Sequence, residues 1–347
     1  MAPVTLAKRV TKQVVGSGVR TATSVVPFRP QGKQSYEDTL RTLSEASVER
    51  CFNAFKDVPW DDPTYAVRDD DERWILPNVD PLGAHPWYQS LSRQRQIEVG
   101  RHRLALVTKI GSQFEQLLLQ GGSGFLLRTP NGNPEFRYFM HELTEETHHI
   151  QMFQEFTNRV CPDVTGAPRW LINAIPLVAQ FGWMSPTMFF TIILAGEEPI
   201  DHVQKDLMRR GGGHPLIERI MQIHIAEEAR HIGFAHAWLK QHVPNRGPMA
   251  RAWLGVMWPM SLRLGADAIL VPSKADRELM GIPDEVAADV WGNGPDAAKF
   301  RRDLFSDVRM LADELGLRTP LTRWAWRLWG VDGRPARFRA EPSNAAA

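Results

Sequence analysis

Apolar residues recur at helical spacing along most of the chain, and from about Leu91 onward this pattern dominates. No run of alternating apolar and polar residues is long enough to predict a sheet. Glycine and proline mark expected helix ends, as at Gly121-Gly122 and Pro244. The predicted helices cover 36–55, 91–120, 134–160, 169–195, 199–210, 215–243, 248–266 and 297–316. The chain is therefore predicted to be all-α, with a helical bundle at its core.

One part of this pattern, Trp170–Gly196, contains 27 consecutive residues without a charge. A helix of that length is long enough to cross a bilayer. Pro186, however, would divide the stretch into two helices that are each too short to span about 30 Å. We therefore expect two buried segments with a bend between them, and no membrane span.

The two ends of the chain differ from the helical region. The first 36 residues contain six basic side chains and no acid, which predicts a mobile arm over 1–36, with a targeting peptide as the weaker alternative. Residues 37–330 are predicted to form a single all-helical domain. A flexible tail is predicted over 331–347.

Composition and charge are those of an ordinary globular protein. Lysine and arginine together number 41, against 40 for aspartate and glutamate, so the formal net charge of +1 provides no global field to attract nucleic acid. The two cysteines, Cys51 and Cys161, lie far apart, which excludes a disulfide framework and a four-cysteine zinc site. This cysteine usage favours a reducing, cytoplasmic setting.

Histidines and glutamates gather in two segments, 141–149 and 224–231. Each segment contains Glu-Glu-x-x-His or its one-residue slip, and a Glu at i shares a helix face with a His at i+3. In the second segment, His224, Glu228 and His231 fall within an arc of about 60° around the helix axis. Their side chains can therefore reach a single point.

Two further acids stand out by their apolar surroundings. Glu115 is the only charged residue between Lys109 and Arg128, and Glu197 directly follows the uncharged stretch. A buried ionised carboxylate costs several kcal/mol unless it is paired or metal-bound. For each acid alone, a helix end or an exposed edge is an equally good interpretation. Beside two Glu/His segments, a metal ligand becomes the favoured one.

Four predicted helices would thus supply a complete set of carboxylate and imidazole ligands. The predicted set contains Glu115, Glu146, His149, Glu197, Glu228 and His231. One Glu from each of two helices, with Glu-x-x-His from each of two others, is the arrangement found in di-iron and di-manganese bundles. These ligand types suit iron or manganese better than structural zinc. The metal-binding bundle is expected to cover about 90–240.

The first segment leaves a choice of register, because Glu145 with His148 has the same spacing as Glu146 with His149. We prefer Glu146 with His149, since Glu-Glu-Thr-His-His-Ile then aligns with Glu-Glu-Ala-Arg-His-Ile at 227–232.

Two nearby acids are candidates for a supporting role. The alignment places Glu142 opposite His224, where Glu142 is either a hydrogen-bond partner behind the ligands or a surface acid. Asp201, one turn after Glu197, is a candidate acceptor for the N–H of a ligand imidazole, which would fix its tautomer.

The order Glu, Glu-x-x-His, Glu, His-x3-Glu-x2-His over about 90–240 resembles the AurF-like di-iron N-oxygenases, the family of p-aminobenzoate N-oxygenase in the ferritin-like superfamily. That family adds a third histidine one turn before the last glutamate, and His224 stands in this place. The resemblance implies a ferritin-like bundle with additional N- and C-terminal helices. It also implies two ions, one held by Glu115, Glu146 and His149, the other by Glu197, His224 and His231, with Glu228 and Glu146 as bridges.

The resemblance further implies a non-haem di-iron oxygenase whose catalytic residues are the metal ligands themselves. Its cofactors would be two Fe ions, with Mn as the alternative, and O2 would be the co-substrate. The substrate would be a small-molecule amine, an arylamine oxidised towards a hydroxylamine or nitro compound. Because no flavin, ferredoxin or nicotinamide motif occurs in the sequence, electrons would come from an external donor. A homodimer is expected by resemblance.

Other functions stay open at this stage. A di-iron hydroxylase or desaturase acting on C–H bonds would use the same ligand types. A non-enzymatic ferritin-like metal binder is disfavoured, because a long C-terminal segment follows His236. Large apolar side chains near the uncharged stretch could line a substrate pocket, although core packing is the favoured interpretation: Phe181, Trp183, Met184, Met188, Phe189 and Phe190.

Overall fold

The computed structural model describes residues 35–210 and 213–341, so most of the predicted N-terminal arm lies outside the described residues. The described residues contain helices and no strand, which confirms the predicted all-α fold with additional N- and C-terminal helices. Two short 3-10 helices, η1 (Pro63–Tyr65) and η2 (Glu72–Trp74), lie in the proline-rich segment after the first helix. The α-helices are α1 (Tyr36–Glu49), α2 (Pro86–Ser90), α3 (Arg93–Leu126), α4 (Pro134–Val160), α5 (Arg169–Met184), α6 (Pro186–Arg210), α7 (Pro215–His242), α8 (Pro248–Leu270), α9 (Lys274–Met280), α10 (Asp284–Trp291), α11 (Pro295–Leu304), α12 (Ser306–Glu314) and α13 (Arg323–Leu328).

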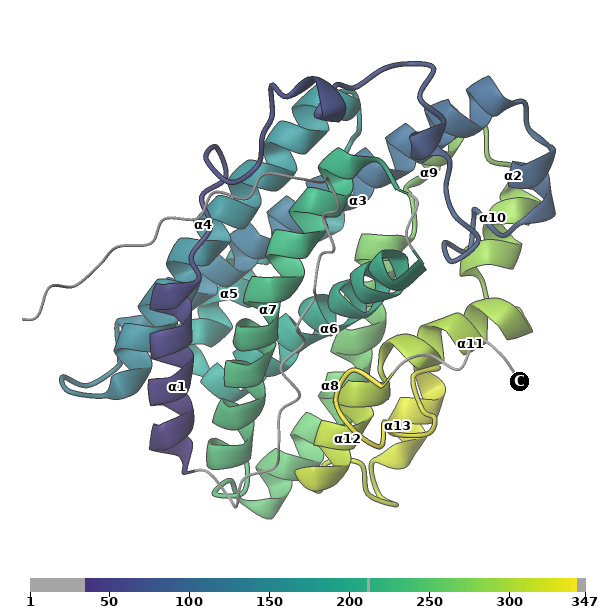
Figure 1. Ribbon diagram of the computed structural model, residues 1–347. Coiled ribbons are helices and arrows are strands. Elements are labelled where there is room, and N and C mark those ends of the chain that lie inside the picture. The colour runs from purple at the N-terminus through teal and green to yellow at the C-terminus, as the bar shows by residue number, and fades with distance from the viewer. Residues whose placement is uncertain (1–34, 211–212, 342–347) are drawn as a thin grey trace, which may run out of the picture. The chain divides into compact units, whose positions relative to one another are not determined.

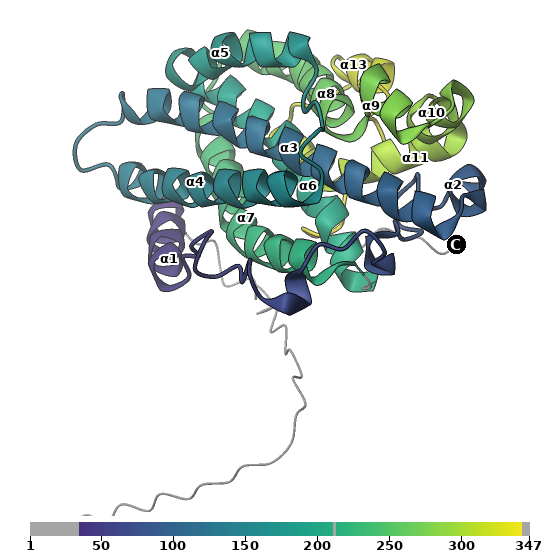
Figure 2. The same ribbon diagram turned by 90° about the horizontal axis from the view of Figure 1, so that it is seen from above.

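The central bundle is formed by α3, α4, α6 and α7 (Figure 1). The helix α4 packs along α3, α7 packs against both α4 and α6, and the view from above shows α3 and α4 side by side (Figure 2). Three further helices cover this bundle, since α1 lies against α4 and α7, α5 against α3, and α8 against α6. The four helices predicted to carry the metal ligands therefore form one packed unit.

The uncharged stretch is divided at the position that the sequence predicts. The helix α5 ends at Met184, and α6 begins at Pro186, because proline has no N–H and restricts the residue before it. The α6 part is buried as predicted, with Phe189 fully enclosed, whereas α5 leaves Leu177 and Met184 exposed. The prediction of two buried segments is therefore correct only for the second one.

A different stretch, Pro248–Met280, is the one place among the described residues that is long and apolar enough to cross a membrane by length and composition. Half of its most apolar window is buried, and its first helix, α8, packs against α6 and α13. A core helix of a soluble protein meets the same criterion, so this stretch is weak evidence for a membrane span.

The helix α3 does not stop at Gly121-Gly122 but continues to Leu126. These glycines instead make room for neighbouring helices, since a Cβ on Gly121 would lie 2.3 Å from the ring of Phe189 on α6 and one on Gly122 would lie 2.7 Å from Leu143 on α4. Glycine at a helix contact and glycine at a helix end give the same signal in the sequence, which explains the error.

The helix α6 likewise continues through Pro199, where the sequence predicts a break. Proline costs one internal hydrogen bond, the one to the carbonyl of Ala195, and α8 passes close to that carbonyl at Gly265. Packing thus holds the helix across the defect. As a result, Glu197 lies inside a helix rather than at its end.

Part of the predicted flexible tail packs against the domain. Val331 is fully buried, and the N–H of Ala336 donates to the carbonyl of Ser306 at 2.9 Å. The buried guanidinium of Arg309 donates to the carbonyl of Arg334 at 2.8 Å. Hydrogen bonds of Arg309 and of the backbone therefore hold 331–341 against the domain. Residues 342–347 lie outside the described residues.

Candidate metal centre

All the residues predicted to bind metal are buried in the middle of the bundle, and none has more than 3% of its surface exposed. The helices α3 and α6 contribute one acid each, α4 contributes two ligands, and α7 contributes three. In chain order they are Glu115, Glu146, His149, Glu197, His224, Glu228 and His231. Four helices therefore bring four carboxylates and three imidazoles into one apolar interior.

Six of these seven side chains form two overlapping groups of four, in which the ligand atoms lie within 4.8 Å of one another. The first group contains Glu115, His149, His224 and Glu228, and the second contains Glu146, His149, Glu228 and His231. His149 and Glu228 belong to both groups. Glu228 therefore lies between two potential metal positions, where a bridging ligand is expected.

The individual contacts show how the ligand atoms converge. The Nδ1 of His231 lies 2.8 Å from Glu146 Oε1 and 3.0 Å from Glu228 Oε1. The Nδ1 of His149 lies 2.9 Å from Glu146 Oε2 and 3.4 Å from Glu228 Oε1. Two imidazoles thus present the same ring atom to the same pair of acids.

His224 enters the site with its other ring nitrogen. Its Nε2 lies 3.3 Å from Glu115 Oε1 and 3.7 Å from Glu228 Oε1. The resemblance assigns His224 and Glu115 to different ions, whereas the structure places them side by side. Which ion each of them binds stays a prediction.

Glu197 belongs to neither group of four, but it is close enough to Glu228 and Glu146 for their charges to affect it. Burial, followed by these two neighbours, raises its pKa well above the usual range. Burial together with Glu146 and Glu197 raises the pKa of Glu115 in the same way. Without a cation, these two carboxyl groups are therefore driven towards the neutral form.

Two of the three imidazoles, those of His149 and His231, are instead driven towards the charged form. Burial would lower the pKa of His149, but Glu146 outweighs it and raises the pKa to about 10. The pKa of His231 is also raised, because Glu228 and Glu146 overcome its burial. At neutral pH the protons on these two imidazoles supply the positive charge that metal ions would otherwise supply. Bound metal ions would displace them, since metal ligands must be deprotonated.

Several buried carboxylate oxygens at this site have no hydrogen-bond partner, among them Glu115 Oε2, Glu197 Oε1 and Glu228 Oε2. Buried polar atoms are nearly always partnered, so such orphans need an explanation. Hard, anionic oxygen ligands together with three imidazoles are the donors that iron or manganese prefers. The residues present therefore fit a pair of such ions.

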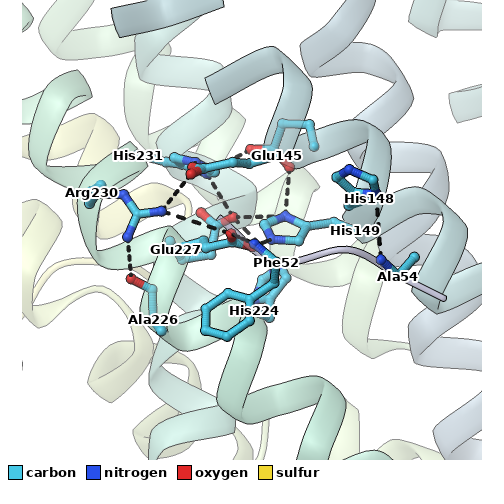
Figure 3. Close-up of polar contacts among 12 residues, drawn as sticks. Phe52, Ala54, Glu145, His148, His149, His224, Ala226, Glu227, Arg230 and His231 are labelled. Atoms are coloured by element: carbon cyan, nitrogen blue, oxygen red, sulfur yellow. Dashed lines mark hydrogen bonds and ion pairs between the residues drawn. The ribbon is translucent and has the colours of Figure 1, made fainter. Parts of the chain in front are cut away.

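Two acids outside the predicted set support the imidazoles in a crossed arrangement (Figure 3). Glu145 on α4 accepts from Nε2 of His231 on α7 at 2.7 Å. Glu227 on α7 accepts from Nε2 of His149 on α4 at 2.8 Å. Each Glu-Glu doublet thus directs its second acid towards the metal site and its first acid towards the histidine of the other helix. This leaves Nδ1 of both rings free to bind metal.

Arg230 joins the two outer acids (Figure 3). Its guanidinium donates to Glu145 at 2.6 Å and lies 3.9 Å from Glu227. The same group donates to the carbonyl of Arg50, and the N–H of Phe52 donates to Glu227 at 3.1 Å. The segment after α1 therefore closes this side of the site, and one buried cation balances two buried carboxylates.

Gln204 supports the third imidazole, since its side-chain oxygen lies 2.9 Å from Nδ1 of His224. The sequence predicts Asp201 for such a role, whereas the structure places Gln204 beside the ring. Asp201 forms an ion pair with Lys205 on the same helix instead. The two positions differ by three residues on α6; Gln204 contacts α7, whereas Asp201 lies beside Asp307 and Ala340.

The structure also distinguishes the two registers of the first motif. His149 is fully buried among the ligands, whereas His148 is partly exposed and lies 3.5 Å from the N–H of Ala54. Glu142 is buried rather than a surface acid, and its Oε2 has no hydrogen-bond partner. It lines an apolar face beside the site together with Glu197 and His231.

That apolar face contains only part of the pocket wall that the sequence suggests. Phe189 and Phe190 line it, while Trp183 and Met184 are exposed to solvent. The remaining apolar residues come from the neighbouring helices: Leu118, Phe139, Ile193, Leu194, Ile232 and Ala235.

The bundle and its ligand set define a class of proteins, the helical bundles that hold two metal ions with carboxylates and imidazoles from four helices. Comparison of sequences identifies the family within this class. The p-aminobenzoate N-oxygenase AurF family matches residues 33–316. The chain therefore belongs to the AurF family, which is a family of di-iron oxygenases, and the predicted resemblance is confirmed.

Similar proteins include the uncharacterized proteins Rv0885 of Mycobacterium tuberculosis and Mb0909 of Mycobacterium bovis. Each is 49% identical to this chain over 310 residues, which cover 89% of this chain and 91% of the relative. No solved structure matches the chain.

Proposed function

We propose that this protein is a di-iron oxygenase that uses O2 to oxidise the nitrogen of a small-molecule amine, an arylamine, towards a hydroxylamine or nitro compound. The observation that carries the proposal is the position of His224, the third imidazole, with Nε2 facing Glu115 and Glu228. Membership of the AurF family supports the oxygenase class. Electrons would come from an external donor.

The residues of the chain would prepare the site in three ways. Glu115, Glu146, His149, Glu197, His224, Glu228 and His231 would hold the two ions. Glu145, Glu227 and Gln204 would fix the tautomer of each imidazole, so that one nitrogen lone pair faces the ions. The apolar face beside Glu197 would exclude water from the reacting nitrogen. The bound iron would supply the activation and reduction of O2.

The first test is the metal content of protein produced in the presence of iron. We expect about two iron ions per chain. Protein that binds no metal under these conditions would contradict every metal-dependent function, including that of a ferritin-like binder.

The second test is a single-turnover reaction. Iron-loaded protein is reduced without oxygen and then exposed to O2 with p-aminobenzoate as the probe arylamine, and the products are identified by mass spectrometry. The His224→Ala variant should lose amine oxidation while keeping its helical content, and His148→Ala should retain the activity. Oxidation of an aliphatic C–H substrate without any amine product would favour the hydroxylase alternative instead.

A further inference from the structure

A second group of reactive side chains lies near the start of α3 and the end of α4, where α9 approaches α3 (Figure 1). Cys161 directly follows α4, His102 lies on α3, and Asp276 lies on α9. Cys161 is 12 residues beyond His149, and His102 is 13 residues before Glu115. At 1.5 Å per helical residue, this group is about 18–20 Å from the metal centre.

The three side chains form a relay from sulfur to carboxylate. Cys161 Sγ lies 3.7 Å from Nδ1 of His102, and Nε2 of the same ring lies 3.1 Å from Asp276 Oδ1. Asp276 is fully buried, and its other oxygen accepts from the hydroxyls of Ser273 at 2.5 Å and Thr165 at 2.6 Å. The carboxylate is therefore held in place and the imidazole is oriented by it, as in other activated thiol nucleophiles.

The charge balance at this relay favours a protonated imidazole beside the sulfur. Burial alone would lower the pKa of His102, but its hydrogen bonds with Asp276 and Cys161 outweigh burial and raise the pKa to about 9. Burial would raise the pKa of Asp276, but its hydrogen bonds with His102 and Ser273 lower the pKa to about 2. An imidazolium N–H pointing at sulfur stabilises the thiolate.

Small molecules can reach the sulfur. Cys161 and His102 both line a cleft of about 300 Å³ that is open to solvent. The C-terminus of α4 would disfavour a thiolate, but Arg101 donates to the last carbonyl of that helix, Val160, at 2.8 Å. The other charged residues of the cleft are Arg95, Glu98 and Asp163.

We propose that Cys161, His102 and Asp276 form a second reactive centre, a thiol modification site at which Cys161 attacks low-molecular-weight disulfides. The thiolate sulfur forms a new S–S bond with one sulfur of the disulfide, whose own S–S bond breaks. The departing thiolate takes up a proton from solvent. Cys161 is oxidised to a mixed disulfide, and the departing sulfur is reduced to a thiol, so the electrons balance.

Cys51 provides an internal contrast. It is exposed, but its partial burial and the charges of Glu145 and Glu227 raise its pKa. The less accessible cysteine should therefore be the more reactive one near neutral pH. Exposure alone would predict the reverse order.

The test uses the full-length Cys51→Ser protein, in which Cys161 is the only thiol, and the neutral probe bis(2-hydroxyethyl) disulfide. Intact-mass spectrometry gives the rate of mixed-disulfide formation between pH 5.5 and 9.5. At pH 7 we expect Cys161 to react at least about tenfold faster than Cys51 does in the Cys161→Ser protein, because the His102 ring faces the Cys161 sulfur. In the Cys161→Ser protein, the rate at Cys51 should still rise about tenfold per pH unit at pH 7.5, since a thiol well below its pKa gains thiolate in that proportion.

Replacing His102 by Gln in the Cys51→Ser background should lower the rate at pH 7 by at least about tenfold, and by less at pH 9.5, because the cation beside the sulfur is lost. A merely structural role of His102 would change the rate by the same factor at both pH values. A rate for Cys161 at pH 7 no higher than that for Cys51, or no reaction of the folded Cys51→Ser protein at any pH, would overturn the proposal whether or not the His102 variant folds.

Discussion

The helices α4 and α7 carry the same Glu-Glu-x-x-His pattern, and the structure uses it in the same way on both. In each, the second acid and the histidine face the metal site, while the first acid supports the histidine of the other helix. The helices differ in their titratable side chains at two matched positions of the segments 142–149 and 224–231. Where α4 has the partly exposed His148, α7 has the buried Arg230, and where α4 has Glu142, α7 has His224.

These differences separate two tasks. The repeated pattern builds a symmetrical frame of two acids and two imidazoles, crossed between the helices. The unmatched residues of α7 then supply what a symmetrical frame lacks: a cation for the outer acids and a third imidazole for the ions. Variants at matched positions can test this division, because each change on α7 has a counterpart on α4.

The largest expected effect concerns the inner acids, Glu228 and Glu146. Glu228 belongs to both groups of four ligands and Glu146 to only one. Glu228→Ala should therefore empty both metal positions, while Glu146→Ala should retain one ion per chain. At metal concentrations about 1,000-fold above Kd, the loss of each ion would also remove about 4 kcal/mol of stabilisation. Metal analysis after dialysis checks this, and equal losses in the two variants would show that the acids are equivalent.

The next effect concerns Arg230 and its counterpart His148. Arg230→Met should lower the free energy of unfolding of the metal-free protein by about 3–5 kcal/mol, because it removes the buried guanidinium that pairs with Glu145. His148→Met, at the matched position on α4, should change it by no more than about 0.5 kcal/mol. Chemical denaturation at pH 7 measures both values. Similar values for the two variants would show that Arg230 and His148 contribute equally to stability, contrary to this prediction.

Much of this site follows from the sequence because helical geometry is local. Spacing of three and four residues places His224, Glu228 and His231 on one face without any knowledge of the fold, and aligning the two doublets selects His149 over His148. The uncharged surroundings of Glu115 and Glu197 likewise indicate burial. The helices themselves can also be predicted because helical geometry is local, since each helix depends on contacts within a few turns.

Contacts between helices are not contained in such patterns. The pairing of Glu145 with His231 depends on the rotation of α4 against α7. The Glu-Glu doublets are visible in the sequence and show that each helix has one acid beyond the predicted ligand, but not which histidine that acid contacts. The choice of Gln204 over Asp201 depends on which turn of α6 faces α7. Similarly, whether Gly121 ends a helix or makes room for a neighbour is decided by the position of Phe189 on α6.

The smallest expected effect concerns Glu142, the counterpart of His224. Burial raises the pKa of Glu142 well above its usual range, so the folded metal-free protein holds this proton more tightly than the unfolded chain does. The contribution of Glu142 to stability therefore falls as the pH rises above about 4.3, the pKa in the unfolded chain. Glu142→Gln resembles the neutral acid in shape but does not titrate.

At pH 4.5, where Glu142 in the folded protein is uncharged, the Glu142→Gln and wild-type proteins should differ by no more than about 1 kcal/mol in their free energy of unfolding. At pH 8 the variant should be the more stable of the two metal-free proteins, since only the wild type must bury a group that is ionised in the unfolded chain. Urea denaturation at both pH values measures the change, with Glu45→Gln on the exposed face of α1 as the control. If the difference between the Glu142→Gln and wild-type proteins did not grow with pH beyond that of the control, Glu142 would have to be paired with compensating positive charge. Glu142 would then take part in the charge balance of the site, as its counterpart His224 does, rather than being merely a buried neutral acid.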